Sequence, residues 1–130
     1  MILQIDDRLT VDEVQDRFNE CFSFLKLAFY SKSHKRFEKS NKEDQYDGRM
    51  LIGDIRNVHI NGPFEIKSWY TTAMVEKELK EVYGLNAQIF RWDKVNGQWI
   101  QTSLSDDLTL MEQTQFAYQQ LAAADPQHNQ

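Results

Sequence analysis

The sequence predicts an α+β domain built as a two-layer sandwich, with a mixed β-sheet whose helices lie on one face. Three observations favour this class. The stretch from Phe64 to Trp92 follows a strand–helix–strand pattern, a similar pattern runs from Ile5 to Phe29, and a length of 130 residues suits one domain. We expect the domain to span residues 1–118, followed by a frayed polar tail at 119–130.

The pattern from Phe64 to Trp92 is the clearer of the two. Phe64 and Ile66 alternate with polar neighbours, as in a half-buried strand. A helix is predicted from about Thr72 to Tyr83, with apolar residues at helical spacing on one side. Gly84 then ends the helix, because glycine readily adopts the left-handed conformation after a helix C-terminus. A second strand follows at 87–92.

The first pattern begins with a short strand at Ile2–Ile5. Thr10 and Glu13 fit a capping box, in which the hydroxyl and the carboxylate satisfy backbone N–H groups at a helix start. The helix that follows carries a stripe of apolar residues, namely Val11, Val14, Phe18, Cys21 and Phe22. Phe24–Tyr30 is predicted as the next strand, with alternate residues on opposite faces.

The two patterns match at an offset of 61 positions, which we interpret as an internal duplication with units at about 1–60 and 61–118. The residues with identical counterparts at this offset are Ile5, Thr10, Val14, Glu20 and Phe29. In the second strand the phase conflicts, since Leu27 aligns with Gln88 unless one residue slips at the turn. Coincidence between two ordinary strand–helix–strand units is the alternative.

Connecting segments have their own signals. Ser31–Asp47 is polar and charged, and we interpret it as a long mobile loop. A short helix is predicted at 50–58, before the chain-breaking triplet at 61–63. Asn96-Gly97 predicts a tight hairpin, with Gln98–Thr102 as the returning strand and a short helix containing Leu110 after it.

Two topologies fit this order of elements. Two strand–helix–strand units can share one mixed sheet with both helices on one face, as in ferredoxin-like folds. The same order, with its turn and short helix, also resembles the latter part of a β-grasp domain. We favour the ferredoxin-like arrangement, and the strand order stays open.

Three segments carry a resemblance to a known family: Ile5–Phe29, Gly84–Arg91 and Ser103–Leu110. They resemble an uncharacterised family of small bacterial α+β proteins with no established activity. The resemblance covers most of the chain, excluding the basic loop and the tail. It implies a bacterial origin and no catalytic residue.

Composition narrows the classes of protein. No apolar run approaches the ~18–20 residues that a membrane span needs, and the N-terminus lacks the pattern of a signal peptide. A single cysteine cannot form an internal disulfide, so we expect a cytoplasmic protein without membrane contact. The net charge of −5 argues against a general binder of polyanions.

Candidates for catalysis or metal binding are weak, and we predict no enzyme activity, no cofactor and no metal. Cys21 lies on the apolar stripe of its helix, where packing is the expected role. The three histidines are scattered without the spacing of a metal site. The pairs Asp6-Asp7 and Asp106-Asp107 precede predicted helices, where acidic residues serve as caps; an enzyme would need them to meet in a deep pocket.

The function we predict is protein interaction, with a protein partner or a second copy of the chain. If Ala87 and Ile89 face the helices, the alternate residues of the sheet present aromatics on an open face. The segment 31–42 is basic, with five Lys or Arg against one Glu. The predicted partner-binding residues are Tyr30, Phe90, Trp92, Lys32, Lys35, Arg36 and Lys39.

Other interpretations of these residues stay open. Bases of a single-stranded nucleic acid can stack on sheet aromatics while lysines hold the phosphates, and this is our alternative function. The basic segment can also be a solvated loop without a partner. The C-terminal segment, finally, can fold back across the open face and cover its aromatics.

Overall fold

The structure is a computed structural model that describes residues 1–35 and 37–123. Its helices and strands, in chain order, are β1 (Ile2–Ile5), α1 (Val11–Cys21), β2 (Leu25–Tyr30), β3 (Gly62–Glu65), α2 (Thr72–Glu81), β4 (Asn86–Asp93), β5 (Gln98–Gln101) and α3 (Leu110–Ala123). Short 3-10 turns lie at Lys42–Asp44, Ile52–Asp54 and Ser103–Ser105. The predicted α+β class is confirmed.

The strands form two antiparallel sheets, so the prediction of a single mixed sheet is wrong. β1 pairs with β3, with Leu3 opposite Phe64. β4 pairs with β2 on one side and with β5 on the other. Each strand of the first unit therefore pairs with its counterpart in the second unit. A ferredoxin-like arrangement needs the strands of both units in one sheet, and these pairings do not form one.

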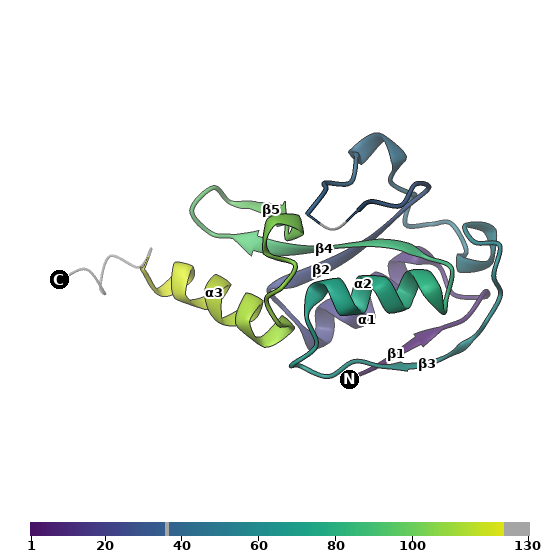
Figure 1. Cartoon of the computed structure of the whole chain (residues 1–130), viewed down its shortest axis with the longest axis horizontal. Coiled ribbons are helices and arrows are strands. Elements are labelled where there is room, and N and C mark those ends of the chain that lie inside the picture. The colour runs from purple at the N-terminus through teal and green to yellow at the C-terminus, as the bar shows by residue number, and fades with distance from the viewer. Residues whose placement is uncertain (36, 124–130) are drawn as a thin grey trace.

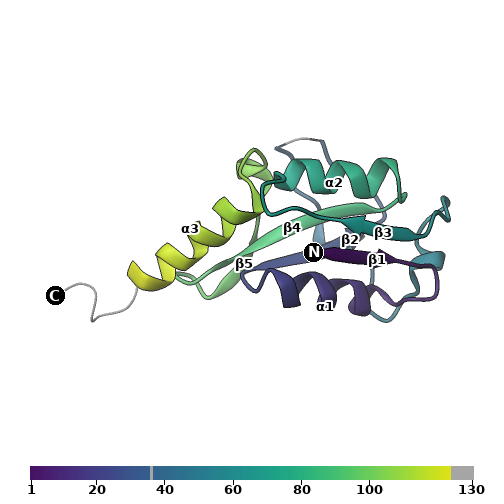
Figure 2. The same ribbon diagram turned by 90° about the horizontal axis from the view of Figure 1, so that it is seen from below.

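The helices α1 and α2 flank the smaller sheet. Figure 2 shows β1 and β3 in front, between α1 and α2, with β2 and β4 behind them. In Figure 1 the helices lie between the level of β4 and the level of the β1–β3 pair. α3 extends away from this body at the end where the β4–β5 hairpin lies (Figure 1).

The core fills the space that these elements enclose. Val14 and Phe18 of α1 and Val75 and Leu79 of α2 are buried, each at a helical spacing that places it on the inner side. They pack with the inward side chains of both sheets, which are Leu3, Ile5, Phe64, Leu25, Leu27, Phe29, Ala87 and Ile89. One continuous core therefore serves both units.

The two units make matching backbone connections at their helix N-termini. In the first, the N–H of Val11 donates to the carbonyl of Met50 at 2.8 Å. In the second, the N–H of Thr72 donates to the carbonyl of Leu108 at 3.2 Å. Thr10 and Thr71 each accept a bond from the third helical residue with their side chains. The same loop-to-helix bridge thus occurs twice.

The phase conflict between the second strands is explained by the turn after each helix. Leu25 and Leu27 point into the core in β2, and Leu85 and Ala87 do so in the second unit. These pairs are 60 positions apart, whereas Phe18 and its helical counterpart in α2 are 61 apart. The second turn is therefore one residue shorter, as the alternation of faces requires.

Several connections differ from the prediction. Within 50–58 the structure has only the 3-10 turn Ile52–Asp54, where we expected a short helix. α3 is longer than the short helix expected, and it continues past Tyr118 to Ala123. A hairpin at Asn96-Gly97 is confirmed, with Gly97 at φ +62°, but its loop spans residues 94–97 and the returning strand ends at Gln101. Residues 124–130 of the predicted tail lie outside the described residues. No described helix has both the length and the apolar character that a membrane crossing requires.

Candidate functional site

The predicted open face is the outer face of the β2–β4–β5 sheet, on the side away from the core. Lys26 lies opposite Phe90, Ala28 opposite Gln88, and Trp92 opposite Trp99. The core side of the same strands carries the inward residues described above. Phe90 and Trp92 therefore point outward as predicted, because successive side chains of a strand alternate between faces.

Tyr30 also belongs to this outer face, but our prediction that it is an exposed anchor is wrong. Its side chain is only 3% exposed. The chain that follows β2 returns alongside it, with a bridge between Tyr30 and Gln45 and a 2.9 Å bond from the N–H of Tyr46 to the carbonyl of Phe29. Burial raises the pKa of the Tyr30 phenol to about 12.

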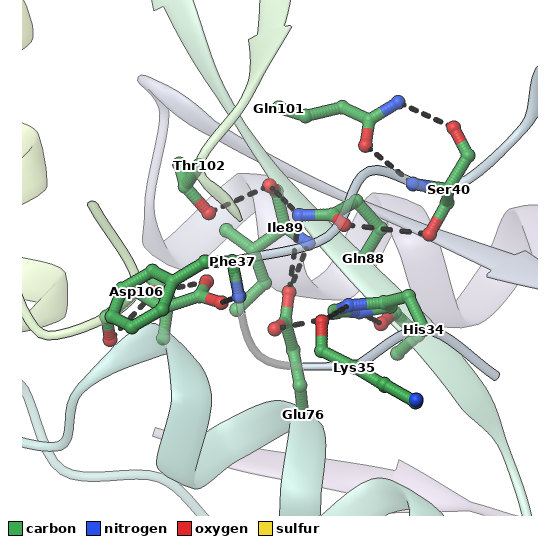
Figure 3. Close-up of polar contacts among 12 residues, drawn as sticks. His34, Lys35, Phe37, Ser40, Glu76, Gln88, Ile89, Gln101, Thr102 and Asp106 are labelled. Carbon is green, nitrogen blue, oxygen red and sulfur yellow. Dashed lines mark hydrogen bonds and ion pairs between the residues drawn. The ribbon is translucent and has the colours of Figure 1, made fainter. Parts of the chain in front are cut away.

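The segment 31–47 covers the middle of the outer face. The backbone of Ser40 is held by the side chain of Gln101, whose Oε1 accepts from the Ser40 N–H and whose Nε2 donates to the Ser40 carbonyl, both at 2.8 Å (Figure 3). Gln88 beneath is fully buried, with its Oε1 3.4 Å from the Ser40 hydroxyl. The C-terminal segment was the alternative cover for the outer face. The C-terminal helix α3 instead packs on the inner side of the sheet, where the side-chain oxygen of Gln113 accepts from Arg91 at 2.6 Å.

A contact between two largely buried side chains attaches the same segment to α2. The Nε2 atom of His34 lies 3.7 Å from Oε1 of Glu76 and 3.1 Å from the carbonyl of Ala87 (Figure 3). Oε2 of Glu76 accepts from the N–H of Ile89 at 2.8 Å and from Gln88 Nε2 at 3.3 Å. Burial, and next the charge of Asp106, raise the pKa of Glu76 well above its usual range, against the Ile89 N–H, which lowers it.

These groups border an open pocket of about 430 Å³ between α2 and the start of the segment. Its lining includes Ser33, His34, Thr71, Met74, Glu76 and Asp106. Asp106 is 1% exposed, accepts from the Thr72 hydroxyl at 3.3 Å, and accepts from the Phe37 N–H at 3.4 Å. The buried carboxylates that line the pocket, Glu76 and Asp106, therefore already accept hydrogen bonds from other groups of the protein.

The sequence analysis did not predict the contact between His34 and Glu76, although the position of Glu76 on a buried helical stripe indicated its burial. Thr72, Val75, Glu76 and Leu79 stand at the spacing of a buried helical stripe, and all four are buried. A charged residue on such a stripe must find partners inside the fold. Nothing local indicated His34, because its partners are distant in sequence.

The end of the outer face beyond Gln88 is partly exposed to solvent. We name Lys26, Phe90, Trp92 and Trp99 the aromatic face. The rings of Trp92 and Trp99 meet edge to face, with centroids 5.3 Å apart. Lys26 Nζ lies 5.0 Å from the Phe90 centroid and 5.4 Å from the Trp99 centroid. Burial, and next the charge of Lys42, lower the pKa of Lys26. All four side chains are half-buried.

The predicted basic residues lie on the covering segment. Lys32, Lys35 and Lys39 are exposed, and Lys32 Nζ lies 3.9 Å from Asp44 Oδ1. Arg36 lies outside the described residues. Lys42, an exposed residue of the same segment, lies close enough to the aromatic face to lower the pKa of Lys26.

The candidates for catalysis do not come together. Cys21 is exposed at the end of α1, where its Sγ accepts from Arg17 at 3.3 Å, so the prediction of a packed core cysteine is wrong. The reason is that Phe22, and not Cys21, packs against the core beyond Phe18 at the end of this helix. Asp7 binds Arg56 at 2.8 Å and His59 at 2.8 Å, on a separate surface from the pocket. Of the predicted carboxylate pairs, Asp106 borders the pocket.

Across residues 1–35 and 37–123, no three His, Cys, Asp or Glu side chains gather in a way that can hold a metal ion. Comparison of the chain with protein-family models, with curated proteins and with solved structures found no significant match.

Proposed function

We propose that this protein is a non-enzymatic interaction module that binds a protein partner through the aromatic face. The observation that carries the proposal is the Trp92–Trp99 pair on the uncovered end of the sheet, with Lys26 held against Phe90 and Trp99. Aromatic and cationic side chains on a rigid sheet are pre-ordered, so little conformational entropy is lost when a partner binds. Such residues dominate the binding energy of protein interfaces.

The charges around the aromatic face favour an acidic partner. Lys42 lies close enough to Lys26 to lower its pKa, and Lys35 and Lys39 are exposed on the same covering segment. A partner that carries carboxylates at its rim would relieve this repulsion and would be steered to the site. Binding should then weaken as the salt concentration rises, because salt screens charges beyond the Debye length.

Single-stranded nucleic acid is the second candidate, and the same lysines beside the same rings favour it. Against it, Lys26 already lies over two of the rings, and the buried Tyr30 cannot stack a base. Binding of mixed oligonucleotides at low salt tests this candidate directly. If the protein binds these oligonucleotides and Trp92→Ala abolishes the binding, nucleic acid and not a protein is the ligand of the aromatic face.

The experiment for the main proposal compares pull-downs by the wild-type protein and three variants. Trp92→Ala and Trp99→Ala truncate the aromatic face. Trp69→Ala is the matched control, because Trp69 is 63% exposed on the turn before α2, away from this face. We expect the partner to be lost with both aromatic-face variants and kept with the control. A partner kept by both variants would contradict the proposal.

The architecture supports a duplicated origin for the two units, which we also propose. The support is the repeated bridge at each helix start and the pairing of each strand with its counterpart. Coincidence would not be expected to place Leu3 opposite Phe64, its own counterpart at offset 61. A sequence relative in which the two units are more alike than here would test the idea; relatives with only one unit similar to this chain would count against it.

A further inference from the structure

The inference concerns β5, the outermost strand of the larger sheet. β4 pairs with one side of β5, and no residue in the described ranges pairs as a strand with its other side. Natural proteins protect such edges with charges, proline or bulges, since unpaired N–H and C=O groups are a template for another strand. Gln98-Trp99-Ile100-Gln101 contains no charged residue and no proline. Its short length of four residues is a protection that natural edges use, but charge and proline, two others, are missing from it.

The direction of the backbone groups on β5 follows from its register. The N–H of Thr102 donates to the carbonyl of Ile89 at 3.1 Å, in the same register that sets Arg91 opposite Ile100. Bonded and non-bonded pairs alternate along an antiparallel ladder. Ile100 therefore directs its backbone groups toward β4, and Trp99 directs its N–H and C=O away from β4, into the open edge.

From this edge we infer that the partner is a second copy of this chain, which pairs its own β5 antiparallel to the first. The inference rests on the proposed function and names one occupant for the aromatic face. A second copy has a net charge of −5 but brings the same lysines to the axis, so backbone pairing and ring contacts, and not charge, would hold it. A twofold axis perpendicular to the sheet keeps the outer face of both copies on the same side, so Trp99 lies opposite Trp99 of the second copy. The N–H and C=O of these two residues then bond to each other, and one sheet continues through both copies.

Two features favour a second copy over another protein at this edge. The strand is uncharged, so two identical strands meet without like charges across the axis. The axis passes through Trp99, which already packs on Trp92, so four tryptophans would form one cluster on the joined outer face.

Sedimentation equilibrium of the wild-type protein, of Trp99→Ala and of the control Trp69→Ala tests the inference. We expect a concentration-dependent dimer for the wild type and the control, and a monomer for Trp99→Ala. Hydrogen exchange gives a second test that needs no variant. The Trp99 N–H should exchange more slowly as the protein concentration rises, whereas the Ile100 N–H, bonded to β4, should not change.

A wild-type protein that is monomeric at every concentration overturns the inference, and so does a dimer in which Trp99 exchange is independent of concentration. If Trp99→Ala unfolds, hydrogen exchange of the wild-type protein is the test of the inference.

Failure of the inference and failure of the proposed function can be told apart. A monomer that still loses a different protein with Trp92→Ala keeps the aromatic face as a binding surface and removes only the second copy.

Discussion

His34 and Glu76 lie 3.7 Å apart, between Nε2 and Oε1, and this contact joins the chain after β2 to the side of α2. Both ring nitrogens of His34 lie near carbonyl oxygens, Nδ1 at 3.0 Å from Lys35 and Nε2 at 3.1 Å from Ala87. Both contacts are hydrogen bonds at once only when the ring carries two protons. One imidazole thus joins the covering segment to both α2 and β4.

Replacing Glu76 by Gln should change how stability depends on pH. The pKa of Glu76 is raised in the fold, mainly by burial. Above the carboxyl's ordinary pKa the folded protein therefore holds a proton that the unfolded chain has lost. The free energy of unfolding must fall as pH rises through this window, at most by about 1.4 kcal/mol per pH unit for one proton. Urea titrations of both proteins from pH 5 to pH 8 measure it.

The expected result is a wild-type stability that falls relative to Glu76→Gln as the pH rises. The comparison isolates Glu76 from carboxylates with lowered pKa values, such as Asp7 and Asp47. Those groups change the free energy of unfolding at more acid pH, outside this window. Parallel pH profiles for the two proteins would show that Glu76 ionises in the fold as it does in the unfolded chain.

Removal of the His34 side chain should loosen the covering segment. His34→Ala loses the contacts to Glu76 and Ala87, and a buried pair of this kind contributes about 1–2 kcal/mol. The triple variant Lys35→Ser, Arg36→Ser, Lys39→Ser should change stability by no more than about 0.5 kcal/mol, since Lys35 and Lys39 are exposed and exposed substitutions have small effects.

Thermal unfolding of both proteins measures the contrast. Equal effects from the two changes, or an unfolded triple variant, would mean that the basic residues themselves hold the segment in place. If the triple variant stays folded and also loses an acidic partner, the segment contributes to the binding surface.

Tyr30 should ionise at a higher pH than an ordinary phenol. Burial raises its pKa to about 12, whereas the unfolded chain ionises this phenol near pH 10. Stability is therefore lost as the pH rises from about 10 toward 12, because only the unfolded chain releases the proton in that range. Phenolate absorbance in an alkaline titration should show a late step that Tyr30→Phe removes. A titration in which all five tyrosines ionise together, before unfolding, would contradict the burial.

The secondary structure was predictable where local chemistry decides it. Thr10 with Glu13, Gly84, and Asn96-Gly97 each fix a helix start, a helix end or a turn within a few residues. Sheet pairing was not predictable, because it depends on contacts between β1 and β3, and between β2 and β4, that lie far apart in sequence. The same alternation of side chains is compatible with one sheet or with two.

The binding surface was predictable in part. Phe90 and Trp92 point outward because alternation along β4 requires it. The burial of Tyr30 was missed, since the segment that covers it is polar and carries no periodic pattern. Trp99 was missed as well. It belongs to the aromatic face because it lies opposite Trp92, and this pairing follows only from the register of the hairpin.

The central claim is that the aromatic face is the binding surface, and site-specific photo-crosslinking in cells tests it most directly. A photoreactive phenylalanine analogue replaces Trp92 in one protein and Trp69, which lies on another surface, in the control. We predict a covalent protein adduct from position 92 and none from position 69, and the adduct's mass identifies a second copy or a different protein. Adducts from position 69 alone, or none from either position, would contradict the claim.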